Sequence, residues 1–301
     1  MPSKLKPSLK PLHDPSQGPL RVVGLMSGSG SNLRKILELQ KRLEEKRGTS
    51  PFQVVAIFTD NPEGSKANQI GKDFGVPVEA IDVKKFYAER GKPLKDLGVR
   101  VEFDKLLVEK LKPYNAKVAA YAGYMRIATK PLLDAFLGVN VHPADLSVLR
   151  GGKRAFTGAH AVRDAILAGQ RHLRSSTHII EPEVDHGRIL MVSSPLRVKR
   201  GKLDKGDKGA VRKFSDEHQE RLKERGDWQV FPRTLLNIAQ GNFKVDDSGR
   251  VYFNNRPAPE GVRLNRSPAV SWGVERVSRA RAKARAALKR RRQRTGLRAL
   301  K

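Results

Sequence analysis

The stretch RVVGLMSGSGSNLRKIL, from Arg21 to Leu37, decides the fold class of this 301-residue chain. Its first part, RVVGLMS (21–27), is a short apolar run of the kind that forms a buried strand, and a glycine-rich loop follows it. Leu33, Ile36 and Leu37 then recur at helical spacing. A strand that leads through a glycine turn into a helix is typical of an α/β sheet with parallel strands.

The same alternation of strands and helices continues along the chain. Further buried strands are predicted at 53–59, 78–81, 117–122 and 139–142, with helices near 66–74, 103–111 and after Pro131. Later elements are predicted as a helix near 159–168, strands at 175–180 and 189–194, a helical region at 216–240 and a hairpin around 247–249. We therefore predict an α/β fold with a mostly parallel, Rossmann-like open sheet, followed by a C-terminal helix and hairpin.

Composition divides the chain into three parts. The apolar stretches lie within residues 20–259, which we predict to be one domain. A flexible N-terminal arm (1–19) is expected before it, and a basic C-terminal extension (260–301) after it, with no packed core beyond about Asn254. Two charged insertions, near 84–99 and 197–213, are expected to lie at the surface.

Residue usage excludes several classes of site. The chain has no cysteine, so it contains no disulfide, no thiolate metal site and no cysteine nucleophile. It has no apolar run of the roughly 20 residues that span a bilayer, and its first residues do not resemble a signal peptide. We expect a cytoplasmic protein without a membrane partner.

The charge balance points to anionic partners. The chain has 60 Lys and Arg against 31 Asp and Glu, a net charge of +29 that concentrates polyanions near its surface. Residues 276–301 contain twelve Lys or Arg and no acidic residue. A cluster within this tail is a candidate for contact with the phosphates of RNA or another polyanion: Lys289, Arg290, Arg291, Arg292 and Arg294. A solvated tail without a dedicated partner is the alternative.

The glycine loop is a candidate anion site. A glycine turn at the start of a helix presents backbone N–H groups and the positive end of the helix dipole. Leu33 occupies the third glycine position of a dinucleotide motif, and no Gly-Lys-Ser/Thr sequence follows. A phosphate monoester is therefore the better functional interpretation, although a tight strand-to-helix turn explains the loop equally well when it is considered alone.

The segment Val139–Pro143 contains the candidate catalytic pair. Residues i and i+2 of a strand share a face, so Asn140 and His142 are predicted to project side by side, at the carboxyl end of a strand where ligands bind. A neutral amide donor beside an imidazole suits a reaction in which negative charge develops on an oxygen. Asp185 is the candidate carboxylate that raises the histidine pKa and orients its ring. A satisfied core histidine and a turn aspartate are the alternatives.

Five motifs carry a family resemblance. They are Ser27-Gly28-Ser29-Gly30-Ser31-Asn32-Leu33, Gly123-Tyr124-Met125-Arg126-Ile127, Asn140-Val141-His142-Pro143, Gly158-Ala159-His160-Ala161 and Val184-Asp185-His186-Gly187. In this order and spacing the chain, from about residue 20 to 259, resembles the phosphoribosylglycinamide formyltransferases, folate-dependent enzymes of purine synthesis. The resemblance implies the formyltransferase fold.

The resemblance also implies roles for individual residues. Asn140, His142 and Asp185 would be catalytic. Gly28, Ser29, Gly30, Ser31 and Asn32 would bind the phosphate of glycinamide ribonucleotide, and Met125, Arg126, Ile127 and Val184 would line the folate pocket. The amine would attack the formyl group of the co-substrate 10-formyltetrahydrofolate, while His142, as imidazolium, and Asn140 stabilise the oxyanion and Asp185 maintains that protonation. The resemblance implies no metal, and a monomer or homodimer.

The chain departs from the family pattern after Pro143. Residues 144–152 (ADLSVLRGG) replace a leucine-rich, proline-containing stretch, and Asp145 is expected to add a carboxylate near the site. Ala128 replaces a common leucine, and His186 a small or polar turn residue. The departures leave two alternatives open: formyl transfer to an aminoacyl-tRNA or amino sugar, or a protein without activity that binds RNA or the ribosome through its basic tail.

Overall fold

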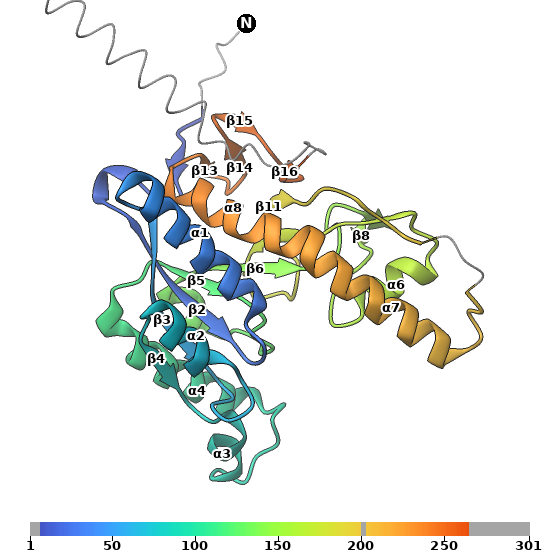
Figure 1. Ribbon diagram of the computed structural model, residues 1–301, viewed down its shortest axis with the longest axis horizontal. Coiled ribbons are helices and arrows are strands. Elements are labelled where there is room, and N and C mark those ends of the chain that lie inside the picture. The colour runs from blue at the N-terminus through green and yellow to red at the C-terminus, as the bar shows by residue number, and fades with distance from the viewer. Residues whose placement is uncertain (1–6, 200–202, 265–301) are drawn as a thin grey trace, which may run out of the picture. The chain divides into compact units, whose positions relative to one another are not determined.

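The opening stretch of the fold is a strand that runs through the glycine loop into a helix. Strand β2 (Leu20–Met26) is almost wholly buried, and helix α1 (Ser31–Arg47) begins after Gly30, whose left-handed backbone (φ 61°) turns the chain. The computed structural model describes residues 7–199 and 203–264. Within them β2 lies between β5 and β3 in an eight-stranded sheet (Figure 1).

The central sheet has the order β16-β11-β10-β6-β5-β2-β3-β4. The pairs among β2, β3, β4, β5 and β6 are parallel, whereas β10 runs antiparallel to both β6 and β11. The prediction of a mostly parallel α/β sheet is confirmed. The further strands are β3 (Phe52–Thr59), β4 (Val78–Ala80), β5 (Val118–Tyr121), β6 (Leu137–His142), β10 (Ser176–Ile179), β11 (Ile189–Val192) and β16 (Val262–Arg263).

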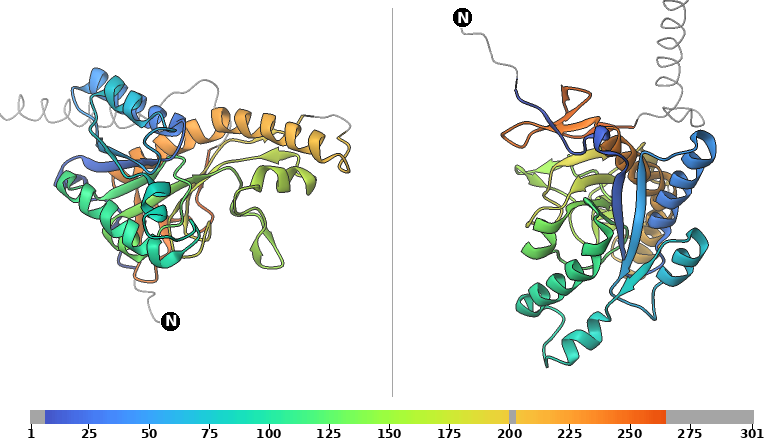
Figure 2. Two further views of the ribbon diagram at one scale, coloured as in Figure 1. Left: turned by 90° about the horizontal axis from the view of Figure 1, so that it is seen from below. Right: turned by 90° about the vertical axis from the view of Figure 1, so that its left-hand side faces the viewer.

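Helices cover both faces of this sheet (Figure 2). Helices α1, α2 (Ala67–Phe74) and α8 (Trp228–Ala239) lie on one face, and α4 (Leu97–Leu111) and α5 (Lys130–Ala135) on the other. Phe103 and Leu107 of α4 are fully buried against strand residues such as Phe58. Strands covered on both faces must be apolar throughout, which explains the unbroken apolar runs in the sequence.

Helices α7 (Lys208–Leu222) and α8 follow each other almost as one long helix, with a π-helical turn, η3 (Lys223–Asp227), between them (Figure 1). Helix α7 packs on α6 (Ala161–Leu167), and α8 packs on α1. The chain must widen by one residue at a π turn, and such turns are frequent at functional sites. Within residues 7–199 and 203–264, no helix has the length and apolarity needed to cross a membrane.

Short strands complete the described fold. A second sheet has the order β1-β13-β14-β15, and two further hairpin-like pairs are β7 with β8 and β9 with β12. The bounds are β1 (Lys10–Pro11), β7 (Leu149–Arg150), β8 (Lys153–Arg154), β9 (His172–Leu173), β12 (Leu196–Arg197), β13 (Phe243–Val245), β14 (Val251–Phe253) and β15 (Arg256–Pro257). The predicted hairpin around 247–249 joins β13 to β14.

The N-terminal arm is not wholly the flexible segment that the sequence predicts. Strand β1 pairs antiparallel with β13, and the Leu12 amide donates to the Phe243 carbonyl at 3.0 Å. A short 3-10 helix follows at Pro15–Gln17, and the buried ring of His13 bonds the Gly18 carbonyl at 3.0 Å. These long-range contacts order the segment although it has no hydrophobic periodicity.

The central sheet extends past the predicted domain end at residue 259. Strand β16 adds a parallel edge to β11, and the Leu264 amide donates to the Val192 carbonyl at 2.8 Å. No described residue after Tyr252 is buried, so strands β15 and β16 extend the sheets beyond Asn254 without adding to the packed core. The remainder of the basic extension lies outside the described residues.

Both insertions contain helical segments that reach the core. Helix α3 (Val83–Ala88) places Phe86 and Tyr87 in the apolar cluster around Phe103, so the insertion at 84–99 is only partly at the surface. The second insertion includes the start of α7, where Asp207 caps the helix by accepting from the amides of residues 209 and 210. Aspartate caps start these helices before the apolar pattern begins.

Replacement of Phe86 tests the correction to the first insertion. The Phe86 ring contacts the Phe103 ring edge-on, with centroids 5.2 Å apart, and is 7% exposed. We expect Phe86→Ala to lower the free energy of unfolding by about 3 kcal/mol, measured by urea denaturation. Lys84→Ala, at an exposed position of the same helix, is the control. A loss below about 0.5 kcal/mol for Phe86→Ala would show that the insertion is a surface bulge.

Candidate active site

A cavity of about 600 Å³ opens at the carboxyl ends of β2, β5 and β6. It brings together every group of the described residues that the sequence predicts for the site: 28–32, 125–127, 140, 142, 184 and 185. In an open parallel sheet the strand ends form a crevice in which ligands bind. The fold therefore collects at one place residues that are far apart in the sequence.

Asn140 and His142 lie on β6 with the spacing that the sequence predicts. His142 is 5% exposed, and its Nε2 bonds the Phe156 carbonyl at 3.0 Å. Its Nδ1 lies 3.4 Å from a carboxylate oxygen of Asp185. That distance exceeds a normal hydrogen bond, as is common before a substrate tightens a catalytic site.

The turn that follows β10 presents Asp185 to the histidine. Asp185 has a left-handed backbone (φ 58°), an uncommon conformation for a residue other than glycine. Its carboxylate accepts from the Gly158 amide at 2.8 Å. Gly187 then passes so close to β10 that an added Cβ would lie 1.8 Å from the Ile179 carbonyl oxygen, so only glycine fits there. Two backbone constraints thus fix the carboxylate.

The charges of Asp185 and His142 depend on burial and on these contacts. Burial alone would raise the pKa of Asp185, but His178, His142 and the Gly158 amide stabilise the carboxylate and hold its pKa at about 2. Burial lowers the pKa of His142 below its ordinary value, and Asp185 opposes that shift without cancelling it. The sequence predicts an imidazolium at His142; in the fold, burial disfavours this charged form and the neighbouring Asp185 carboxylate favours it.

The site of protonation on His142 also follows from the geometry. Since Nε2 keeps its hydrogen for the Phe156 carbonyl, the neutral ring turns the lone pair of Nδ1 toward Asp185. A proton taken up by the ring therefore enters at Nδ1, beside the carboxylate. This arrangement lets His142 accept and return a proton within the cavity.

His178 is a site residue that the sequence reasoning missed. It lies on β10 directly opposite Asn140 and is 2% exposed. Its Nδ1 lies 2.9 Å from the Ile179 carbonyl oxygen, and its Nε2 lies 3.2 Å from the Asn140 amide nitrogen and 3.5 Å from an Asp185 oxygen. His178 thus links both predicted partners of His142. The available signal was a histidine within a predicted strand, residues 175–180.

The glycine loop faces the π turn across one end of the cavity. Lys223 and Asp227, at the two ends of η3, line the cavity together with residues 28–32. The Asn32 side chain donates to Asp227 at 3.4 Å, and the Asp227 carboxyl is buried. Neither η3 residue was predicted, because a helical pattern does not reveal where a π turn falls.

The predicted folate segment forms an apolar rim with a charged anchor. Met125, Ile127 and Val184 line the cavity while 71%, 52% and 52% exposed. Arg126 instead donates to the buried Asp60 carboxylate at 2.7 Å. Apolar side chains exposed at a cavity mouth mark a surface that a ligand covers.

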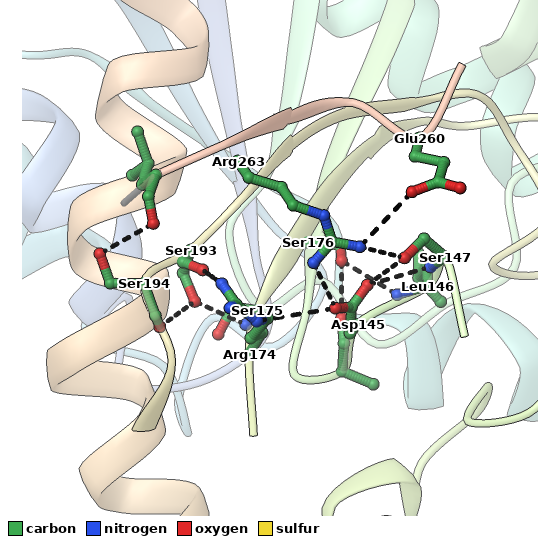
Figure 3. A network of polar contacts seen from close by, with 12 residues as sticks. Asp145, Leu146, Ser147, Arg174, Ser175, Ser176, Ser193, Ser194, Glu260 and Arg263 are labelled. Carbon is green, nitrogen blue, oxygen red and sulfur yellow. Dashed lines mark hydrogen bonds and ion pairs between the residues drawn. The ribbon is translucent and has the colours of Figure 1, made fainter. Parts of the chain in front are cut away.

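The loop after Pro143 does not add a carboxylate to the cavity, contrary to expectation. Asp145 accepts from the Ser147 hydroxyl at 2.6 Å and from Arg263 at 2.9 Å, and Arg174 lies 3.8 Å away (Figure 3). These partners hold it beside a separate cavity of about 260 Å³. The unusual loop therefore leaves the charge of the candidate active site unchanged at this position.

The basic tail and metal binding are the two remaining points of the sequence prediction. The five predicted phosphate-contact residues of the tail, Lys289, Arg290, Arg291, Arg292 and Arg294, lie outside the described residues. Within residues 7–199 and 203–264, no group of three or more His, Asp or Glu is arranged to hold a metal ion.

Comparison with known proteins is consistent with this geometry. The formyl transferase family model matches residues 20–206. The chain is 30% identical over 183 residues to the phosphoribosylglycinamide formyltransferase of Mycobacterium tuberculosis, covering 60% of this chain and 73% of that protein. The crystal structure of glycinamide ribonucleotide transformylase 1 from Symbiobacterium toebii matches with a TM-score of 0.59 at 25% identity, covering 78% of this chain and 94% of that one.

Longer relatives match over part of their length. The trifunctional purine biosynthetic protein adenosine-3 of Gallus gallus is 26% identical over 235 residues, which is 77% of this chain but 20% of that protein. The chain spans about a fifth of the length of such relatives.

Replacement of Asp227 tests the electrostatics of the π turn. Burial raises the pKa of its carboxyl from 3.8 to about 6. Below pH 3.8 the carboxyl is protonated in both the folded and the unfolded state, so its charge does not lower the free energy of unfolding. As pH rises through about 6 this stability is lost, and above that pH the buried charge lowers the free energy of unfolding by up to roughly 3 kcal/mol. We expect Asp227→Asn to raise the free energy of unfolding by about 1–3 kcal/mol near pH 8 and little near pH 4.

Urea denaturation at the two pH values measures this effect. Asp216→Asn, at an exposed position of α7, is the matched control. An Asp227→Asn variant that is equally affected at both pH values, or destabilised near pH 8, would contradict the assignment of a costly buried charge.

Proposed function

The chain belongs to the formyl transferase family, and we propose that it transfers the formyl group of 10-formyltetrahydrofolate to the amine of glycinamide ribonucleotide in purine biosynthesis. The observation that carries this proposal is one cavity that joins a phosphate-type loop, a His–Asp pair with an amide donor, and an apolar rim. These three parts match the needs of the three moieties: an anion, a reacting carbonyl and a flat heterocycle.

The phosphate of the acceptor is proposed to bind at the glycine loop. Residues 28–32 lead into the N-terminus of α1, a helix of 17 residues, where backbone N–H groups and the helix dipole favour an anion. Lys223 lines the same end of the cavity; its Nζ donates to Glu220 at 2.5 Å and is proposed to turn to the phosphate when the substrate binds. The buried Asp227, anchored by Asn32, is placed to accept from a hydroxyl group of the attached sugar.

The formyl donor is proposed to occupy the other end. Met125, Ile127 and Val184 would lose most of their exposure under a pterin-like ring, which gives the burial of apolar area that such a ligand needs. Arg126, held by Asp60, fixes the backbone of this segment so that its amides and carbonyls can pair with the ring edge. A ring held there would leave the formyl group to be received by Asn140 and His142 of β6, which line the same cavity.

The chemistry is proposed to proceed by direct attack of the amine on the formyl carbon. The Asn140 amide donates to the oxygen that becomes negative, and the neutral Nδ1 of His142 accepts the proton that the amine nitrogen loses. The resulting imidazolium is stabilised by Asp185 and also favours the oxyanion. When the carbon–nitrogen bond to the folate breaks, the same proton passes to the departing folate nitrogen. The amine thus gains a formyl group and loses one hydrogen, and the folate loses the formyl group and gains that hydrogen.

Turnover of the two substrates tests the proposed function. We expect the purified protein to form formylated glycinamide ribonucleotide, detected by mass spectrometry, and His142→Ala to lower kcat/KM by on the order of 10²–10⁴. His172→Ala, at an exposed position on β9, is expected to retain activity. If the wild-type protein forms no formylated product, the proposed function is wrong. Activity on formyl acceptors without a ribose phosphate would redirect the assignment.

The proposed phosphate site has its own test. Lys223→Ala is expected to raise KM for glycinamide ribonucleotide roughly 10-fold while kcat changes less than about twofold, because the lost contact is to a part of the substrate that does not react. Lys213→Ala, at an exposed position of α7, is the control. An unchanged KM in Lys223→Ala would place the phosphate elsewhere.

A further inference from the structure

The hairpin β7–β8 lies in the loop after Pro143 and carries the sequence Gly151-Gly152-Lys153-Arg154. Its strands pair in the register Leu149↔Arg154 and Arg150↔Lys153. Gly151 and Gly152 between them both have left-handed backbones (φ 55° and 76°), the conformation of a tight two-residue hairpin turn. This turn fixes which side chains of the hairpin point inward.

Arg154 is the inward residue, and it contacts the turn that carries Asp185. Its Nη1 donates to the Asp185 carbonyl, and its Nη2 donates to the Gly187 carbonyl at 2.9 Å. The neighbouring cation Lys153 is exposed, whereas Arg154 is half-buried. A planar guanidinium with two parallel donors can hold two carbonyls in fixed relative positions, which a lysine ammonium cannot do.

The same loop also forms hydrogen bonds with His142 and with the Asp185 side chain. The Phe156 carbonyl accepts from His142, and the Gly158 amide donates to the Asp185 carboxylate at 2.8 Å. Residues 154, 156 and 158 thus contact in turn the Asp185 backbone, the His142 ring and the Asp185 side chain. The segment forms one wall on which both members of the pair are aligned.

We propose that Arg154 is a positioning residue: by bonding the carbonyls of Asp185 and Gly187, its guanidinium fixes the left-handed turn that keeps the Asp185 carboxylate beside Nδ1 of His142. Arg154 touches neither reacting atom and acts through Asp185. The kinetic test of this inference rests on the proposed function, whereas the NMR tests do not depend on it.

Loss of the Arg154 charge and loss of its hydrogen bonds to the Asp185 turn would shift the pKa of His142 in opposite directions. Experiment can therefore separate the two effects. The groups that act on the His142 ring are Asp185, which raises its pKa, and His178 and Arg154, which lower it. Glu181 and Glu183 act on Arg154 in turn. Removal of positive charge at Arg154 would therefore raise the pKa of His142, whereas loss of the fixed Asp185 turn would lower it.

Arg154→Lys keeps the charge and removes the fork, so it isolates the positioning effect. We expect the pKa of His142, followed by NMR titration of its ring signals, to fall relative to the wild-type protein. We expect kcat to fall roughly 10- to 100-fold, with KM for both substrates within about twofold, because the reacting groups are misplaced while binding contacts remain. Arg212→Lys, the same substitution at an exposed position of α7, is the control and should change none of these values.

Several results would overturn the inference. If the Arg154→Lys variant keeps the wild-type pKa of His142 and the wild-type kcat, the positive charge alone is sufficient. The bidentate contact of the guanidinium then has no positioning role. A measurement on the unmodified protein guards against a variant that fails to fold: the Arg154 Nη–H groups should give separate, exchange-protected NMR signals. Averaged, rapidly exchanging signals would contradict the bidentate contact. Absence of turnover in the wild type would remove the proposed function but would leave both NMR readouts decisive.

Discussion

The candidate active site depends on one carboxylate. Asp185 accepts from the Gly158 amide, lies beside Nδ1 of His142 and within 3.5 Å of His178, and it does so from a left-handed turn. Its pKa of about 2 shows that these contacts outweigh the cost of burying the charge. Because the segments that meet at Asp185 come from β6, β10 and the loop after β8, formation of the sheet is what creates the site.

The α/β architecture was predictable because its signal is local. Strands covered on both faces are unbroken apolar runs, and a helix follows each run with its own spacing, as residues 20–47 show. The two-residue strand Lys10–Pro11 and the edge strand Val262–Arg263 were not predictable. They are held by pairing with residues far along the chain, and neither has enough length to show a period.

The site was predictable to the extent that strand geometry and turn residues fix it. Asn140 and His142 follow from the two-residue repeat of a strand, and the five motifs identified the family that the comparisons show. His178 was missed because its pairing with Asn140 requires the register of two strands that are not adjacent in sequence. Lys223 and Asp227 were missed because a π turn shifts the helical phase. The lowering of the His142 pKa by burial was also not predictable, because burial is a property of the folded chain.

Asp185 and His142 are proposed to act as one electrostatic unit, in which the carboxylate favours protonation of the ring. The most direct test of this proposal is an NMR titration of the His142 ring in the wild-type protein and in Asp185→Asn. Asparagine keeps the size of the side chain but removes its charge, so the pKa of His142 should fall by roughly one unit or more, given an opposite charge at this separation. An unchanged His142 pKa in Asp185→Asn would show that the two residues are neighbours without coupling, and it would contradict the account.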